Sequence, residues 1–110
     1  MSGIIFFKTK ELDTLKSFYI DKIGCQLWQE KQGNVVLKNG NFLFGFTQGE
    51  EAEVAGALTF FYEKMEEVDH LYETIKEIAV FAPVMNDSHE VYHFFAKDPE
   101  GRIVEFQSFD

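Results

Sequence analysis

Two side chains near the end of the chain, His93 and Glu105, are of types that could exchange a proton with a ligand. A carboxylate partly withdrawn from water suits a general base, and a histidine changes its charge near neutral pH. Their positions predict neighbouring strands of one hairpin, with the two side chains diagonal on the same face. They could therefore form an acid–base pair. A histidine hydrogen-bonded to Gln107 or to water is the more ordinary alternative and is favoured on sequence alone.

The turn between these two strands determines which residues face each other. The segment Asp98-Pro99-Glu100-Gly101 has the residues of a type I turn followed by a left-handed glycine, a three-residue loop that pairs Asp98 with Arg102. This register places Phe95 opposite Glu105, on the face that carries His93. We expect that face to be a concave binding surface, since the opposite face is apolar and must pack on a helix. The apolar face comprises Tyr92, Phe94, Ala96, Val104 and Phe106.

The remaining reactive side chains are weaker candidates. His89 lies four strand residues from His93, which is roughly 13 Å, so the two cannot hold one ion unless the chain bends. His70 lies off the apolar face of a predicted helix and is expected in solvent. Cys25 follows Gly24, a predicted helix cap, and is interpreted as buried filler rather than as a nucleophile.

The aromatic side chains are candidates for the walls of a binding site. Thirteen of the 110 residues are Phe, which provides a large apolar area without a polar group. Phe6 and Phe61 alternate with residues expected in the core, so they should face the other side of their sheets. A dimer contact is an equally weighted alternative for these rings, and Trp28 is either a ligand-stacking ring or a packing anchor. The predicted ligand-binding residues are Phe6, Trp28, Phe44, Phe61, His93, Phe95 and Glu105, and Glu105 is the one candidate catalytic residue.

Two similar sets of elements must position these residues. Alternation, helical periodicity and turn residues predict strands at 4–9, 25–30, 34–38 and 41–47 around a helix at 11–23, followed by a loop at 48–56. A helix at 65–78, a loop at 83–89 and strands at 90–97 and 102–108 follow a second opening strand. The Gly24 cap and the Asn39-Gly40 hairpin turn support these boundaries.

The opening strand and helix repeat at a constant offset of 53 residues, which indicates an internal duplication. On the strands, Leu58, Phe60 and Tyr62 match the expected core positions of the first half, Ile5, Phe7 and Thr9. The two helices should pack on their sheets through Leu12, Leu15, Phe18, Met65, Val68, Leu71 and Ile75.

The totals exclude several classes of partner. The formal net charge of −9 would repel nucleic acid and anionic lipid, and suits a cationic or neutral ligand, although it can also serve only solubility. A single cysteine rules out an internal disulfide. There is neither an apolar run of membrane-spanning length nor a cationic leader. A cytoplasmic protein is therefore expected.

Two stretches resemble a known superfamily. Residues 11–19, which end in Phe18-Tyr19, followed by Ile23-Gly24, are similar to the first helix of the vicinal oxygen chelate superfamily. This superfamily includes glyoxalases, bleomycin-resistance proteins and extradiol dioxygenases. Residues 95–106 are similar to its DPxG hairpin and final (I/V)-E-(L/F), although Arg102 replaces the usual Asn. The resemblance implies an α+β fold of two βαβββ modules, about 3–48 and 56–110, in a single domain whose sheets form an incomplete barrel around a cleft.

The resemblance also implies where a divalent metal would be held. In metal-using members four inward side chains bind the ion, and their positions correspond here to Ile4, to Phe44 or Gly45, to Ala57 and to Glu105. Only Glu105 can ligate, whereas a protein metal site normally needs about three side-chain ligands. We therefore expect no metal or other cofactor.

These observations favour a metal-free protein that binds a small molecule in an aromatic, acidic cleft and forms a homodimer, similar to the bleomycin-resistance branch. The alternatives are a metal-dependent lyase, isomerase or dioxygenase of the same superfamily, and a degenerate module with only a structural role. Glu105 bears on this choice. With no cation in reach, desolvation would penalise its charge, so that Glu105→Gln would stabilise the fold. Pairing with His93, Lys97, Arg102 or a bound metal would reverse that effect, and a metal would reopen the metal-free interpretation.

Overall fold

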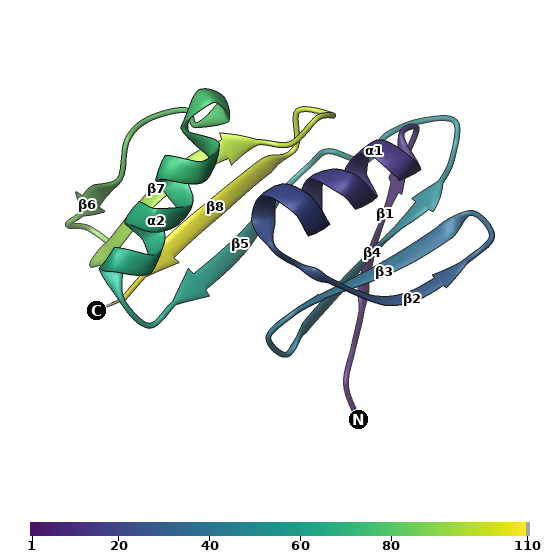
Figure 1. Cartoon of the computed structure of the whole chain (residues 1–110), viewed down its shortest axis with the longest axis horizontal. Helices are drawn as coiled ribbons and strands as arrows, with labels where there is room; N and C mark the ends of the chain where they lie inside the picture. Colours follow the sequence, from purple (N-terminus) through teal and green to yellow (C-terminus); the bar gives the residue numbers. More distant parts are fainter. Residues whose placement is uncertain (110) are drawn as a thin grey trace. The chain divides into compact units, whose positions relative to one another are not determined.

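The structure, a computed structural model that describes residues 1–109, is an α+β fold in which each half contains a strand, a helix and three further strands (Figure 1). The chain divides into two compact units, Met1–Val54 and Ala55–Asp110. Each unit contains one four-stranded mixed sheet that does not close on itself. The predicted class and the two βαβββ modules are confirmed.

The first unit has the sheet order β1-β4-β3-β2. Strand β1 is parallel to β4, and the other neighbours are antiparallel. Its helix starts as an α-helix and widens into a π-helical segment that ends at Gly24, whose φ of 91° is the left-handed conformation expected of a glycine cap. The elements are β1 (Ile5–Thr9), α1 (Leu12–Ser17), the π-helical segment (Phe18–Ile23), β2 (Gln26–Lys31), β3 (Asn34–Asn39) and β4 (Phe42–Gln48).

The core of the first unit lies between this helix and one face of its sheet. Leu15, Tyr19 and Ile23 are buried at a constant spacing of four residues along the helix. The Tyr19 ring packs on Phe44 and Phe46 of β4, with ring centroids 5.3 and 5.4 Å apart. The predicted helix is thus confirmed with a wider last part.

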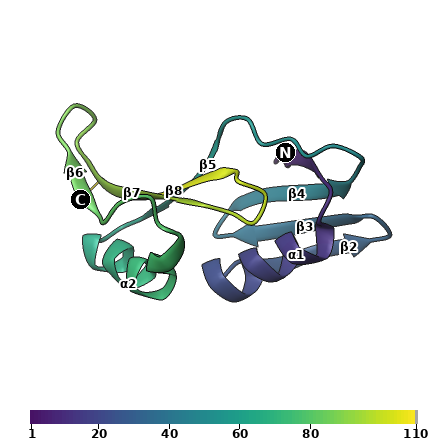
Figure 2. The same cartoon turned by 90° about the horizontal axis from the view of Figure 1, so that it is seen from above.

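The second unit repeats this plan with the sheet order β5-β8-β7-β6. Strand β5 is parallel to β8, and the other neighbours are antiparallel. Figure 2 shows helix α2 along one side of this sheet. The elements are β5 (Ala57–Tyr62), α2 (Met65–Ile75), a 3₁₀ turn (Lys76–Ile78), β6 (Val84–Asn86), β7 (Val91–Lys97) and β8 (Ile103–Ser108).

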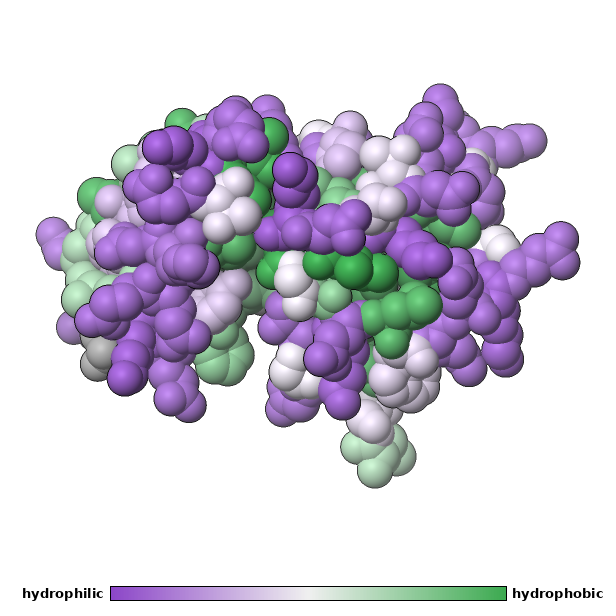
Figure 3. All heavy atoms as spheres, viewed as in Figure 1, coloured by the Kyte–Doolittle hydropathy of each residue, from purple (hydrophilic) through white to green (hydrophobic). Residues whose placement is uncertain are grey.

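Helix α2 buries Val68, Leu71 and Ile75 against its sheet. On the sheet, the Phe94 and Phe106 rings lie 5.2 Å apart and are fully buried. The side of α2 that faces away from the sheet is hydrophilic (Figure 3). This separation confirms the predicted apolar face of the last hairpin as the helix-packing face. The buried sheet residues on that face are Leu58, Phe60, Phe94, Ala96, Val104 and Phe106.

The turn between β7 and β8 has the predicted register. The backbone N–H of Asp98 donates to the carbonyl of Arg102 at 2.9 Å, and Gly101 has φ 86°. Phe95 pairs with Glu105, as the turn residues predicted. In the first unit, Asn39 pairs with Phe42, so the two loop residues are Gly40-Asn41, one position later than predicted.

Some predictions from the sequence are wrong in detail. The loop predicted at 83–89 contains strand β6, because Val84 and its neighbours pair with β7. Met65 stays 37% exposed because it begins the first turn of α2, and Ile5, expected in the core, is 48% exposed on the edge strand β1.

Candidate functional site

The candidate site lies on the face of the second sheet that α2 leaves uncovered, which we call the open face. Side chains alternate along strands, so the partners of the register define this face. In one row across the sheet lie Thr59, Glu105 and Phe95, and in the next lie Phe61, Gln107, His93 and Val84. Its residues are Ala57, Thr59, Phe61, Val84, Asn86, Val91, His93, Phe95, Lys97, Ile103, Glu105 and Gln107.

His93 and Glu105 meet on this face. The Nδ1 atom of His93 lies 2.7 Å from Oε2 of Glu105, and the side chains are only 8% and 15% exposed. The Thr59 hydroxyl donates to the other carboxylate oxygen, Oε1, at 3.0 Å. Both oxygens of Glu105 therefore have a donor. The structure favours the diagonal pair over the alternative in which Gln107 satisfies His93.

Aromatic rings border this pair. Phe95 lies edge-on to the imidazole of His93 with ring centroids 5.1 Å apart. Phe81, from the segment that follows α2, contacts His93 at 5.6 Å and Phe95 at 5.4 Å. The segment is held in place because the backbone N–H of Val80 donates to the Phe95 carbonyl at 2.7 Å. The two rings explain why a histidine on a helix-free face is mostly buried.

The other predicted site residues are divided between the units. Phe61 belongs to the open face and is 68% exposed, and its ring centroid lies 6.0 Å from that of Phe109. Phe6 and Trp28 are about half exposed and belong to the first unit. Phe44 is wrong as a wall residue, since its ring packs on Tyr19 of the π-helical segment and its exposed fraction is 0%.

The first unit has a different composition at the position equivalent to Glu105. Phe6 pairs with Gly45 in the same way that Thr59 pairs with Glu105. The Phe6 ring covers the glycine so closely that a Cβ atom there would lie 2.5 Å from a ring carbon. Of the two alignments open in the sequence, the register therefore selects Gly45 as the equivalent residue.

The residues at the four metal positions implied by the fold do not fit a metal ion. They are Ile4, Gly45, Ala57 and Glu105, of which only Glu105 has a ligating side chain. Its two oxygens already accept hydrogen bonds. Within residues 1–109, no group of three or more His, Cys, Asp and Glu side chains is placed to hold an ion.

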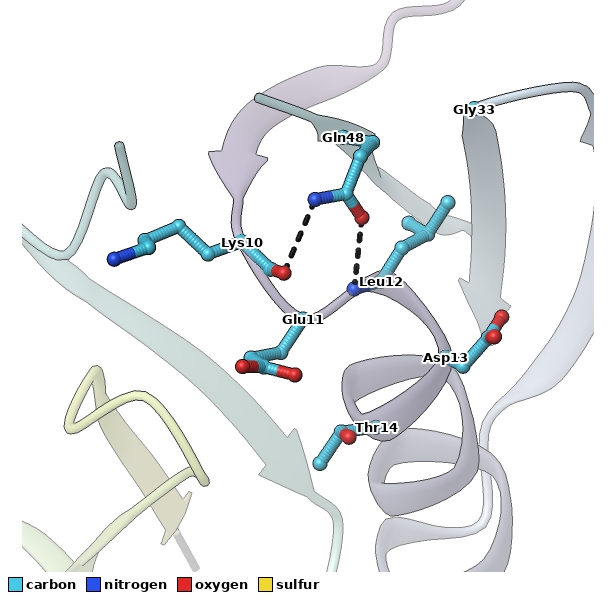
Figure 4. Close-up of a pocket in the computed structure, with 7 residues that line it drawn as sticks. All are labelled: Lys10, Glu11, Leu12, Asp13, Thr14, Gly33 and Gln48. Atoms are coloured by element: carbon cyan, nitrogen blue, oxygen red, sulfur yellow. Dashed lines mark hydrogen bonds between the residues drawn. The ribbon is translucent and has the colours of Figure 1, made fainter. Parts of the chain in front are cut away.

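Two hollows are lined by residues of the first unit, and Glu105 lines neither of them. One, of about 290 Å³, adjoins the start of α1 (Figure 4). There the Gln48 side chain reaches from the end of β4, donating to the Lys10 carbonyl at 3.0 Å and accepting from the Leu12 N–H at 3.3 Å. Gln48 thus provides hydrogen-bond partners for backbone groups at the start of the helix. We therefore assign this hollow a structural role. The other hollow is lined by the loop at 49–53.

A buried ionic cluster supports the turn that presents Glu105. Arg102 is 1% exposed, and its guanidinium donates to Asp98 at 2.7 Å and to Glu100 at 3.3 Å. Asp98 also accepts from the backbone N–H groups of Glu100 and Arg102 at 2.9 and 3.0 Å. Arg102, where the resemblance expects Asn, therefore fixes the hairpin from inside the turn.

Cys25 and the other histidines have the environments that the sequence predicts. Burial raises the pKa of the Cys25 thiol to about 11, partly offset by a hydrogen bond from Asn39, so the thiol stays protonated and unreactive at neutral pH. His70 is exposed on α2. His89 is also exposed and contacts Asn86, not His93.

Sequence reasoning missed Thr59 and Phe81. For Thr59 a signal existed, because it lies between Ala57 and Phe61 in the strand alternation, and the 53-residue offset pairs it with Phe6. Phe81 had no comparable signal. Its position depends on where the chain after α2 returns to the edge of β7, which neither periodicity nor turn residues determine.

Comparison with solved structures identifies the fold. An integron cassette protein from the mobile metagenome of the Halifax Harbour sewage outfall superimposes with a TM-score of 0.83 at 19% identity, covering 98% of this chain and 99% of that one. A glyoxalase/bleomycin resistance protein/dioxygenase family enzyme from Burkholderia phytofirmans PsJN gives 0.83 at 18% identity, covering 97% of each chain. Lactoylglutathione lyase from Agrobacterium tumefaciens gives 0.79 at 20% identity, covering 98% and 92%.

The chain therefore has the fold of the glyoxalase/bleomycin resistance/dioxygenase proteins, in agreement with the motifs on its first helix and last hairpin. No sequence family and no curated protein matches the chain. Between residues 1 and 109, no helix is long and apolar enough to cross a membrane. At 16–20% identity these structures define the fold, and the activity must be argued from the site.

Proposed function

We propose that this protein binds a small, flat organic cation on the open face, without a metal ion. The observation that carries the proposal is the Glu105 carboxylate, mostly withdrawn from water and bordered by aromatic rings on a face without a helix. Rings offer stacking and cation–π contacts, and a carboxylate in such surroundings attracts positive charge. The net charge of −9 adds a long-range attraction for cations.

Ligand binding is the first measurement that tests the proposal. Thermal shifts and calorimetric titrations with quinolinium-type cations should show binding that weakens as salt increases, whereas matched neutral and anionic aromatics should bind more weakly. Phe95→Ala and Glu105→Gln should each lower the affinity, while His70→Gln on the outer side of α2 is the matched control. Equal binding of cations and anions would contradict the proposal.

Metal content is the second measurement. Purified protein should contain far less than one Zn, Ni, Mn or Fe per chain, because the donor set at the implied positions is incomplete. About one bound metal per chain, lost together with ligand binding in Glu105→Gln, would instead favour a metal-dependent lyase, isomerase or dioxygenase.

We also propose that the protein forms a homodimer. Phe61 and Phe109 expose 68% and 66% of their surface and touch each other, an apolar area that a second copy would cover. Light scattering should give the mass of a dimer, and Phe61→Asp should give a monomer. A monomeric wild-type protein at micromolar concentration would contradict this.

A further inference from the structure

The hydrogen bonds of Glu105 determine the proton position on His93. An ionised carboxylate only accepts hydrogen bonds, so Thr59 donates to one oxygen and His93 must donate to the other through Nδ1. When the imidazole is neutral, its proton is therefore on Nδ1, and Nε2 has a free lone pair. Glu105 thus acts as a positioning residue for the histidine.

The second nitrogen of His93, Nε2, takes no part in the pair with Glu105. None of residues 1–109 forms a hydrogen bond with Nε2, since Nδ1 makes the one hydrogen bond of this side chain. No fully buried side-chain nitrogen or oxygen among them lacks a partner, so Nε2 retains contact with solvent. It lies in a ring whose neighbours are Phe81 and Phe95. In the neutral imidazole, an acceptor with some contact with solvent therefore lies beside two aromatic rings.

We propose that His93 Nε2 selects the ligand: among flat cations, this site prefers those that carry an N–H donor, such as protonated heteroaromatic bases, over quaternary cations. The inference rests on the proposed function and deepens it. The charge of Glu105 attracts any cation, whereas Nε2 of His93 is a directed acceptor that can form a hydrogen bond only with a ligand that has an N–H group.

The size of this preference follows from the cost of an unsatisfied acceptor. A ligand that stacks on the rings removes water from Nε2, and a quaternary nitrogen offers nothing in return. A hydrogen bond with a charged donor contributes more than a neutral one, so a preference of about tenfold or more is expected. Stacking and overall charge cannot produce it, because both are the same in a matched pair of probes.

The probes are 4-(dimethylamino)quinoline, protonated on its ring nitrogen at pH 7, and its 1-methyl quinolinium derivative. Both carry one positive charge on the same ring system, and they differ in that one has N–H where the other has N–CH₃. Calorimetric titration should show about tenfold tighter binding of the protonated base. In nitrogen NMR, the Nε2 signal of His93 should move with the protonated base, while the signals of His70 and His89 stay in place.

Variants separate the contributions. In His93→Phe the two probes should bind equally, and Thr59→Val, which leaves the Nδ1 contact, should retain the preference. Glu105→Gln should weaken the binding of both probes. If His93→Phe fails to fold, Glu105→Gln provides the test instead, because the preference for the protonated base should fall when the tautomer of His93 is no longer fixed. Equal wild-type affinities, or a preference that survives in His93→Phe, would overturn the inference but leave the cation site standing. If neither probe binds, the proposed function is wrong and the inference with it.

Discussion

Replacing Glu105 by Gln gives a sharp test of the site through stability alone. If the Glu105 carboxylate had no hydrogen-bond partner, loss of its charge would stabilise the fold. In the structure the carboxylate has two donors, His93 Nδ1 at 2.7 Å and the Thr59 hydroxyl at 3.0 Å, and is 15% exposed. The pairing therefore reverses the expected sign, and Glu105→Gln should destabilise the protein at pH 8.

The magnitude follows from these two hydrogen bonds. A hydrogen bond to a charged group contributes about 1.5–3 kcal/mol, and a Gln amide can retain one of the two at the strength of a neutral bond. We expect a loss of about 1–3 kcal/mol. Proteins of this size are stable by about 5–15 kcal/mol, so the effect is well within measurement.

Urea unfolding at pH 8 of the wild type, Glu105→Gln, His93→Phe and the double variant provides the assay. The double-mutant cycle should give a coupling of about 1–3 kcal/mol between the two residues. Thr59→Val removes the other hydrogen bond to the same carboxylate and should cost about 1.5–3 kcal/mol, while the coupling between His93 and Glu105 remains. If Glu105→Gln is as stable as the wild type or more so, with no coupling, desolvation dominates and the pair does not hold the site together.

Three further predictions concern the framework. Leu15→Ala and Leu71→Ala remove side chains buried between a helix and a sheet, and should each lower the free energy of unfolding by about 2–5 kcal/mol in urea titrations; near-neutral values at both would contradict the helix packing. Asp98→Asn leaves the Arg102 guanidinium buried with a weakened partner and should cost about 3–5 kcal/mol, whereas an unchanged melting temperature would show that the cluster does not support the turn. Because folding raises the pKa of Cys25 from 9.0 to about 11, its stabilising contribution is fully present below pH 9 and is lost as the pH rises towards 11. The stability difference between the wild type and Cys25→Ala should therefore shrink between pH 8 and pH 11, and a constant difference would contradict the shift.

Most of the fold could be predicted because local signals agree. The offset of 53 residues, the Gly24 cap and the 98–101 turn each determine backbone geometry through residue type, and the register of the last hairpin follows from that turn alone. The predicted face of Glu105 followed directly, since strand alternation leaves one alternative once the register is known.

The rest depended on tertiary packing. Sequence could not choose between Phe44 and Gly45, because a shift of one residue exchanges the two faces of β4. The His93–Glu105 contact needed the side-chain conformations, and Phe81 needed the path of the chain after α2. Short strands such as β6 have too few residues for any periodicity to show.

The Phe6–Gly45 contact has a consequence for engineering. The two halves have the same backbone plan, so the register pair Thr59 and Glu105 has an equivalent pair in the first unit, Phe6 and Gly45. Transferring the pair to the first unit requires Phe6→Thr and Gly45→Glu together, because a side chain at position 45 would collide with the Phe6 ring. The duplication thus provides a second sheet with the same backbone plan. A second recognition surface can be engineered on it while the Thr59 and Glu105 pair is kept.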